Sequence, residues 1–153
     1  MQKITTFLTF KDKAEEAAKL YTSIFKDSKI NNVTHYKGGP MPADSVMTVE
    51  FELAGQKYVA MNGGPHFTFT DGISLAVSCA DQAEIDELWQ KLTANGGQPG
   101  QCGWLKDPFG VSWQITPVNL GQLLRSDDPA RAQRKIGALM QMHKIDISAL
   151  EQA

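Results

Sequence analysis

The feature that most constrains this chain is a repeated order of predicted elements. The tetrad Asp12-Lys13-Ala14-Glu15 recurs 69 positions later as Asp81-Gln82-Ala83-Glu84. Each tetrad follows a strand-like run and opens an amphipathic helical pattern, and three further strand-like runs follow each helix. The sequence therefore predicts two copies of a β-α-β-β-β module. The predicted strands are residues 4–10, 30–37, 45–53 and 56–61 in the first copy, and 73–79, 98–102, 103–106 and 111–115 in the second.

Both tetrads have the composition of a helix N-terminus. Asp12 and Asp81 are predicted N-caps, and each is followed three residues later by a glutamate, which is the spacing of a capping box. After Asp81, the residues Ile85, Leu88 and Leu92 recur at helical spacing. We therefore expect each helix to pack one apolar stripe against its sheet.

The last strand pair of the second copy is predicted to be a tight hairpin. The turn contains Asp107, whose side chain can accept a hydrogen bond from the backbone two positions on, and Gly110, which can adopt positive φ. The strand after the turn alternates, so Trp113 and Ile115 lie on one face and Gln114 lies on the other. Gln114 is thus predicted to point away from the core.

The residues after position 117 predict helices. Asp128-Pro129 supplies an N-cap with proline in the first turn, and Asp146 is placed to cap a short last helix with Leu150 facing inward. The segment holds no catalytic motif. We interpret it as a helical extension that covers a sheet edge or a dimer seam.

Composition limits the classes of function. The chain has 153 residues, 42% hydrophobic and 21% charged, with a formal net charge of −2. This balance indicates a globular protein without the basic surface of a nucleic-acid or anionic-membrane binder, and no apolar run is long enough for a membrane span. The first residues lack a signal-peptide core, so we expect a cytoplasmic protein. Cys79 and Cys102 have neither disulfide-framework nor zinc-site spacing.

Several segments resemble the PhnB-like group of the vicinal oxygen chelate superfamily, which includes glyoxalase, bleomycin-resistance and dioxygenase proteins. The resemblance rests on Leu20-Tyr21-x-x-Ile24-Phe25, on residues 61–65, on the segment from Cys102 to Gln114, and on residues 144–147. It implies an α+β fold in which modules of about residues 1–62 and 73–117 form one domain, 1–117, followed by a helical extension, 118–153. Members of this group often carry the name 3-demethylubiquinone-9 3-methyltransferase.

The resemblance also implies where a metal would be bound in metal-dependent relatives. There, the first and last strands of each module direct four side chains, usually His and Glu, to one divalent ion. The matching positions fall near Thr5 or Thr6, at Asn62, near Ser74 and at Gln114. Their neutral oxygens would not compete with water for such an ion. We therefore expect no metal and no other cofactor.

The remaining residues suggest a ligand cavity. We expect a small, partly apolar molecule to be bound by neutral polar and aromatic side chains: Tyr58, Asn62, Ser74, Trp104 and Gln114. One alternative is an isomerase, lyase or transferase-like enzyme that uses a weakly held metal or His66 as an acid-base group. Another is a structural or interaction dimer without a ligand. Methyl transfer is not expected, because no Gly-x-Gly-x-x-Gly loop follows a strand.

The resemblance implies a homodimer, because modules of this fold commonly pair across two chains and small paired sheets leave edges that dimerisation covers. Light scattering of the purified protein is expected to give the mass of two chains. A mass of one chain that stays constant over a wide range of protein concentration would contradict the prediction.

Overall fold

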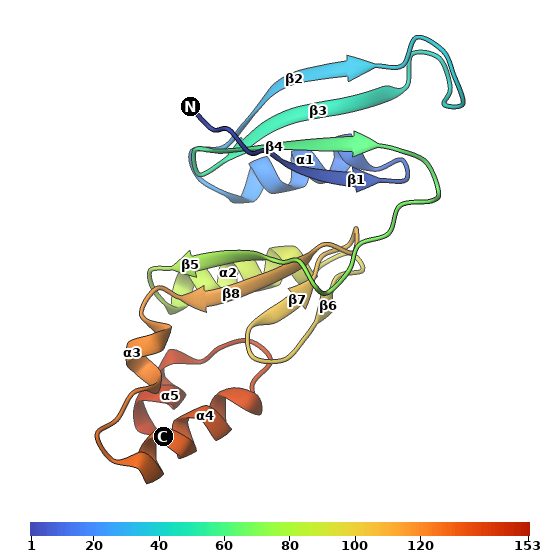
Figure 1. Ribbon diagram of the computed structural model, residues 1–153. Coiled ribbons are helices and arrows are strands. Elements are labelled where there is room, and N and C mark those ends of the chain that lie inside the picture. Colours follow the sequence, from blue (N-terminus) through green and yellow to red (C-terminus); the bar gives the residue numbers. More distant parts are fainter. The chain divides into compact units, whose positions relative to one another are not determined.

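The structure is a computed structural model that describes residues 1–153. It divides into two compact units, Met1–Thr68 and Phe69–Ala153. Each unit contains one four-stranded mixed sheet with a helix between its first and second strands, as labelled in Figure 1. The predicted α+β fold of two β-α-β-β-β modules with a helical extension is therefore confirmed.

The first and last strands of unit 1 are neighbours in its sheet. The sheet order is β1-β4-β3-β2, in which β1 and β4 are parallel and the other neighbours are antiparallel. Because β1 and β4 pair in parallel, Thr6 lies beside Tyr58 although 51 residues separate them in the sequence. The elements are β1 Thr6–Phe10, α1 Ala14–Ile24, β2 Lys29–His35, β3 Val46–Leu53 and β4 Gln56–Asn62.

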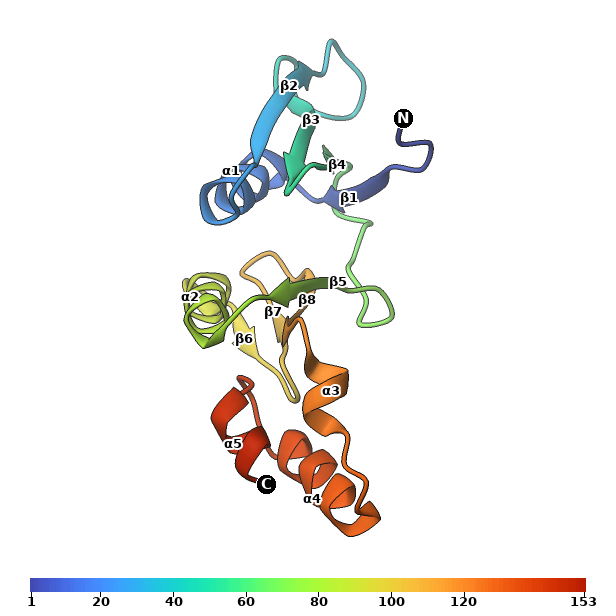
Figure 2. The ribbon, with the colours of Figure 1, turned by 90° about the vertical axis from the view of Figure 1, so that its left-hand side faces the viewer.

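Helix α1 covers one face of this sheet, as Figure 2 shows. The alternation of side chains along each strand sends Leu8, Val49 and Ala60 to the helix side, where they are buried. Tyr21 of α1 is fully buried and its ring lies 6.2 Å from that of Phe51 on β3. The opposite face of the sheet carries the polar and exposed residues of the same strands.

The N-terminus of α1 is capped differently from the prediction. The N-cap is Lys13, and no side chain of the helix's own first turn caps it, so the expected role of Asp12 is wrong. The Ala14 N–H instead donates to Oδ1 of Asn62, 2.9 Å away, at the end of β4. Asn62, which lies 48 residues from Ala14 in the sequence, thus supplies the hydrogen-bond acceptor that a local side chain normally provides.

Unit 2 repeats the arrangement with the order β5-β8-β7-β6, again with its first and last strands parallel. Here the predicted cap is confirmed: Asp81 accepts a hydrogen bond from the Glu84 N–H, and the Glu84 carboxylate accepts from the Ala80 N–H. The elements are β5 Leu75–Cys79, α2 Gln82–Thr93, β6 Gln98–Pro99, β7 Trp104–Lys106 and β8 Ser112–Pro117.

Asp107 holds the turn between β7 and β8. Its Oδ1 accepts hydrogen bonds from the N–H groups of Phe109 and Val111 at 2.9 and 3.0 Å, and Oδ2 accepts from the indole N–H of Trp113 at 2.9 Å. The side chain is almost completely buried, and Gly110 has φ +92°. The predicted hairpin is confirmed, and Trp113 packs inward while Gln114 projects from the other face.

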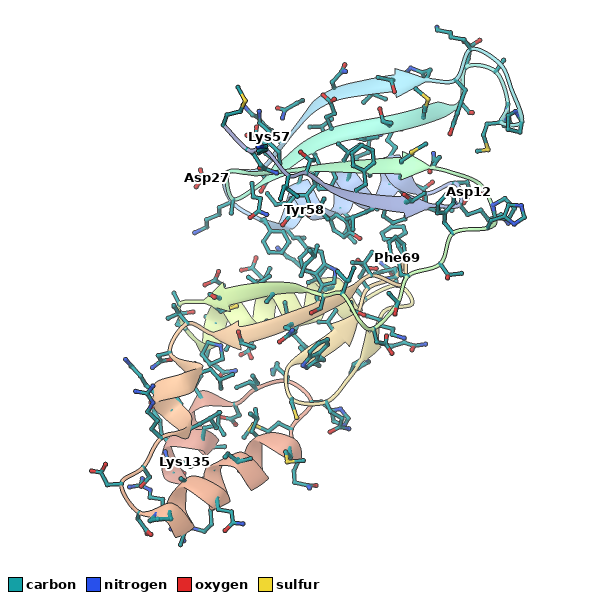
Figure 3. The ribbon with its side chains drawn as sticks, viewed as in Figure 1. Asp12, Asp27, Lys57, Tyr58, Phe69 and Lys135 are labelled. Atoms are coloured by element: carbon teal, nitrogen blue, oxygen red, sulfur yellow. The ribbon has the colours of Figure 1, made fainter.

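Three helices complete unit 2: α3 Leu120–Leu124, α4 Pro129–Met140 and α5 Ile147–Gln152. Helix α3 was not predicted, whereas Asp128 and Asp146 cap α4 and α5 as expected. Lys135 of α4, labelled in Figure 3, is buried and donates to the carbonyl oxygens of Leu123 and Leu150. One cation therefore joins the three helices. None of the helices has the length and hydrophobicity needed to cross a bilayer.

The chain between α4 and α5 is bound to the rest of unit 2. The carbonyl oxygens of Met142 and His143 accept hydrogen bonds from the N–H groups of Cys102 and Gly103, each 2.8 Å long. The side chain of Gln82 donates to the Ile145 carbonyl and accepts from the Ile147 N–H. We call residues 142–147 the strap. The strap supplies partners that the hairpin and the start of α2 would otherwise lack.

Replacing Asp107 by Asn should destabilise the protein by about 3 kcal/mol, because an amide cannot accept three hydrogen bonds and a buried N–H would lose its partner. The free energy of unfolding in urea measures the effect. A matched control is Asp71→Asn, which removes an exposed ion pair with Lys106 and should cost less than about 1 kcal/mol. Equal losses in the two variants would contradict the role assigned to Asp107.

Candidate functional site

Two predicted site residues meet on the uncovered face of the unit 2 sheet. Gln114 on β8 donates from Nε2 to Oγ of Ser74, 2.8 Å away, immediately before β5. Parallel pairing of β5 with β8 produces this contact, because Ala76 lies beside Gln114 and Ser74 comes just before it on the same face. Both side chains are half-buried.

Trp104 lies next to this pair. It faces Gln114 directly in the antiparallel pairing of β7 with β8, so the two side chains share a face. Trp104 is 37% exposed, whereas Trp113 beside it on the other face is buried. The structure thus brings together three of the five predicted ligand residues.

The three side chains can form both directed and flat contacts. After the bond to Ser74, the Gln114 amide retains its carbonyl oxygen and a second N–H, and the Ser74 hydroxyl can still rotate to donate. The exposed indole offers an apolar plane. We call Ser74, Trp104 and Gln114 the amide site.

The corresponding positions of unit 1 follow from the repeated pairing. Thr6 pairs with Tyr58 in the first sheet as Leu75 pairs with Trp113 in the second. Thr5 therefore corresponds to Ser74, and Val59 corresponds to Gln114. These positions lie on the uncovered face of the unit 1 sheet.

Tyr58 and Asn62 lie on the other face, on the side of helix α1. Tyr58 stacks on Phe51 with ring centroids 5.6 Å apart, and burial raises the pKa of its hydroxyl. Figure 3 labels Lys57 and Tyr58, which are consecutive on β4 and so belong to opposite faces. The Tyr58 ring therefore packs on the helix side of the sheet, whereas Thr5 and Val59 lie on the uncovered face.

Asn62 is fully engaged by the fold. Its Oδ1 accepts from Ala14, its Nδ2 donates to the Val46 carbonyl at 3.1 Å, and its own carbonyl accepts from the Tyr36 hydroxyl. The side chain is 6% exposed. Both ends of the amide are thus bound to backbone groups, and the residue joins α1, β3 and β4.

The donor set at the four positions does not fit a divalent metal. Thr5, Ser74 and Gln114 offer neutral oxygens, and Val59 offers none, whereas transition metals require imidazole, thiolate or carboxylate ligands. In neither unit do three or more His, Cys, Asp or Glu side chains gather to hold an ion. No chemical step through a metal is therefore derived for these positions.

Three further reactive side chains are His66, Cys79 and Cys102. His66 is exposed in the loop between β4 and β5. Cys79 is fully buried, and desolvation, with smaller contributions from the nearby carboxylates of Glu84 and Asp81, raises the pKa of its thiol to about 12. Cys102 is half-buried at the turn that the strap holds, with φ +58°. None of the three meets Ser74 or Gln114 through a hydrogen bond.

The sequence analysis missed a charged hollow in unit 1. It has a volume of about 540 Å³ and is lined by the charged side chains of Lys29, Glu50, Glu52 and Lys57 and by Thr5, Asn31, Phe51, Tyr58 and Val59. The signal was present in the strand Val49-Glu50-Phe51-Glu52-Leu53, whose alternation places both carboxylates on the uncovered face. By itself, this pattern predicts only a strand.

Comparison with known proteins shows the family. The family model described as 3-demethylubiquinone-9 3-methyltransferase matches residues 2–116. A PhnB protein from Bacillus cereus is 40% identical, and the match covers 76% of this chain and 99% of that one with a TM-score of 0.70. The chain belongs to the PhnB-like family.

More distant structures share the fold of this PhnB-like protein. A protein from Pseudomonas aeruginosa is 20% identical, with coverage of 76% and 98% and a TM-score of 0.63. The fosfomycin resistance protein FosX from Listeria monocytogenes, in complex with Mn(II) and sulfate, is 20% identical, with coverage of 82% and 100% and a TM-score of 0.56. The predicted vicinal oxygen chelate fold is thereby confirmed. No curated protein matches the chain.

The structure assigns Asn62 of this PhnB-like protein to the scaffold. Asn62→Ala should lower the free energy of unfolding by about 2 kcal/mol, because it leaves buried backbone groups without partners. Asn62→Asp retains the acceptor for Ala14 and should preserve more protection of that amide in hydrogen exchange. The control Asn32→Ala removes an exposed side chain from β2 and should leave both measurements unchanged. Wild-type stability in Asn62→Ala would show that the amide is available for another purpose.

Proposed function

We propose that this PhnB-like protein binds a small, partly apolar molecule at the amide site without a metal. The observation that carries the proposal is the hydrogen-bonded pair of Ser74 and Gln114 on an uncovered sheet face, with Trp104 beside it. Such a site suits a planar ligand that stacks on the indole and exchanges hydrogen bonds with the amide. We also propose that the protein binds this molecule as the cytoplasmic homodimer that its sequence predicts.

Chemical fit supports binding over metal-dependent catalysis. Metal-assisted reactions need a ligand set that holds a cation against water, and the positions Thr5, Val59, Ser74 and Gln114 do not provide one. Likeness to the Mn(II)-bound FosX extends to the fold only. Mn(II) is therefore not proposed as a cofactor of this chain.

Methyl transfer, which the family description names, is not the function we propose. The sequence has no Gly-x-Gly-x-x-Gly loop to hold the nucleotide part of a methyl donor. Each sheet has only one parallel strand pair, whereas nucleotide sites of that type lie at the ends of extended parallel sheets. Titration with S-adenosylmethionine is expected to cause no saturable change in the tryptophan fluorescence of the protein.

A thermal-shift screen with naphthoquinones, aromatic amides and hydrophobic antibiotics should identify at least one saturable ligand. Gln114→Leu should weaken its binding by about tenfold or more, because the ligand's polar group would then face an apolar side chain without a partner. Ser74→Ala should have a smaller effect, since the Gln114 amide remains. Persistent silence across the panel would contradict the proposal.

Tryptophan fluorescence locates the bound molecule. A ligand stacked on Trp104 should quench part of the emission, and Trp104→Phe should abolish that quenching. The control Trp89→Phe alters a residue of α2, outside the amide site, and should retain it. Quenching that disappears in the control and persists in Trp104→Phe would place the ligand elsewhere.

A further inference from the structure

The charged hollow of unit 1 contains ordered rows of side chains. Antiparallel pairing places Lys29 beside Glu52 and Glu52 beside Lys57, so a cation, an anion and a second cation cross three neighbouring strands. Two residues from Glu52 along β3, and on the same face, Glu50 pairs with Val59 of β4. The uncovered face therefore presents a fixed pattern of charges.

Part of this pattern is already neutralised within the protein. The Glu52 carboxylate accepts a hydrogen bond from Asn31 at 3.1 Å and forms an ion pair with Lys29 at 3.6 Å. The hydrogen bond from Asn31, the charge of Lys29 and, more weakly, the charge of Lys57 hold the pKa of Glu52 below its usual value. The charges of Glu52 and Lys29 thus offset each other.

Two opposite charges lie outside the ion pair of Lys29 and Glu52. Neither Lys57 nor Glu50 forms an ion pair, although both line the hollow. They occupy diagonal positions on β4 and β3, where Cα atoms are about 7 Å apart, and Val59 and Glu52 occupy the other diagonal on the same face. The Thr5 hydroxyl, another hydrogen-bond donor, lies at the Lys57 end because Thr5 precedes the pair Thr6 and Tyr58.

We propose that this hollow binds a small zwitterion, with the anionic group at Lys57 and Thr5 and the cationic group at Glu50. A short apolar chain between the two groups would lie on Val59. The volume of about 540 Å³ is within the range of small-molecule sites. A ligand with a single charge satisfies only one of the two side chains, so the arrangement favours a molecule that carries both.

The residues of this proposal differ from those of the amide site. All its residues belong to unit 1, whereas Ser74, Trp104 and Gln114 belong to unit 2. Gln114→Leu should leave zwitterion binding unchanged. Failure of one proposal can therefore be distinguished from failure of the other.

The probe is 4-aminobutanoate, titrated into the full-length protein while backbone amide resonances are followed by NMR. Saturable shifts are expected at residues 50–52 and 57–59. Butanoate and butylammonium, which each carry one of the two charges, should bind about fivefold more weakly. Equal binding of all three compounds, or no saturable shift in this segment, would overturn the proposal.

Charge reversal gives the sharper test. Glu50→Lys leaves two cations and should switch the preference to the dianion glutarate, whereas Lys57→Glu leaves two anions and should switch it to 1,4-diaminobutane. The double variant Glu50→Lys/Lys57→Glu should recover 4-aminobutanoate binding in the reversed orientation. Preferences that remain unchanged in folded single variants would overturn the proposal.

Lys26→Glu is the matched control, because it reverses an exposed charge of unit 1 outside the hollow. It should retain the wild-type order of affinities. A change in preference as large as that of Lys57→Glu would mean that general surface charge, and not the hollow, determines binding, and would overturn the proposal.

Discussion

The parallel pairing of the first and last strand of each module is the interaction on which the rest of the structure depends. It places residues far apart in sequence in adjacent strands, so Ser74 meets Gln114 and Thr5 comes near Val59. It also sets the face to which each side chain points, because one residue of slip would exchange the two faces. Core packing and the candidate sites are therefore fixed by the same register.

Local sequence patterns were sufficient to predict the fold, whereas the residues of the candidate site depend on long-range pairing of strands. The alternation around Trp113 and the turn at Asp107 predicted the hairpin and the direction of Gln114, since both depend on neighbouring residues. Asn62 could not be placed in the same way. Its role depends on an Ala14 N–H that reaches it only after α1 has packed on the sheet. The same long-range contact explains why the local cap predicted at Asp12 is absent.

The duplicated modules carry different chemistry on equivalent faces. The face of the second sheet presents a serine hydroxyl, an amide and an indole, whereas the face of the first presents two carboxylates and two ammonium groups. Most of the buried helix-side residues of both modules are apolar, as close packing requires, and Asn62 is a hydrogen-bonded exception.

The strap has a consequence for the order in which the chain can fold during its synthesis. All strands and the helix of unit 1 lie within the first 68 residues, so this unit contains its own partners as soon as that segment has emerged from the ribosome. The hairpin of unit 2 differs, because the N–H groups of Cys102 and Gly103 donate to the carbonyl oxygens of Met142 and His143, which are synthesised later. About forty further residues must be translated before those bonds can close. The two units can therefore complete their backbone hydrogen bonds only at different stages of synthesis.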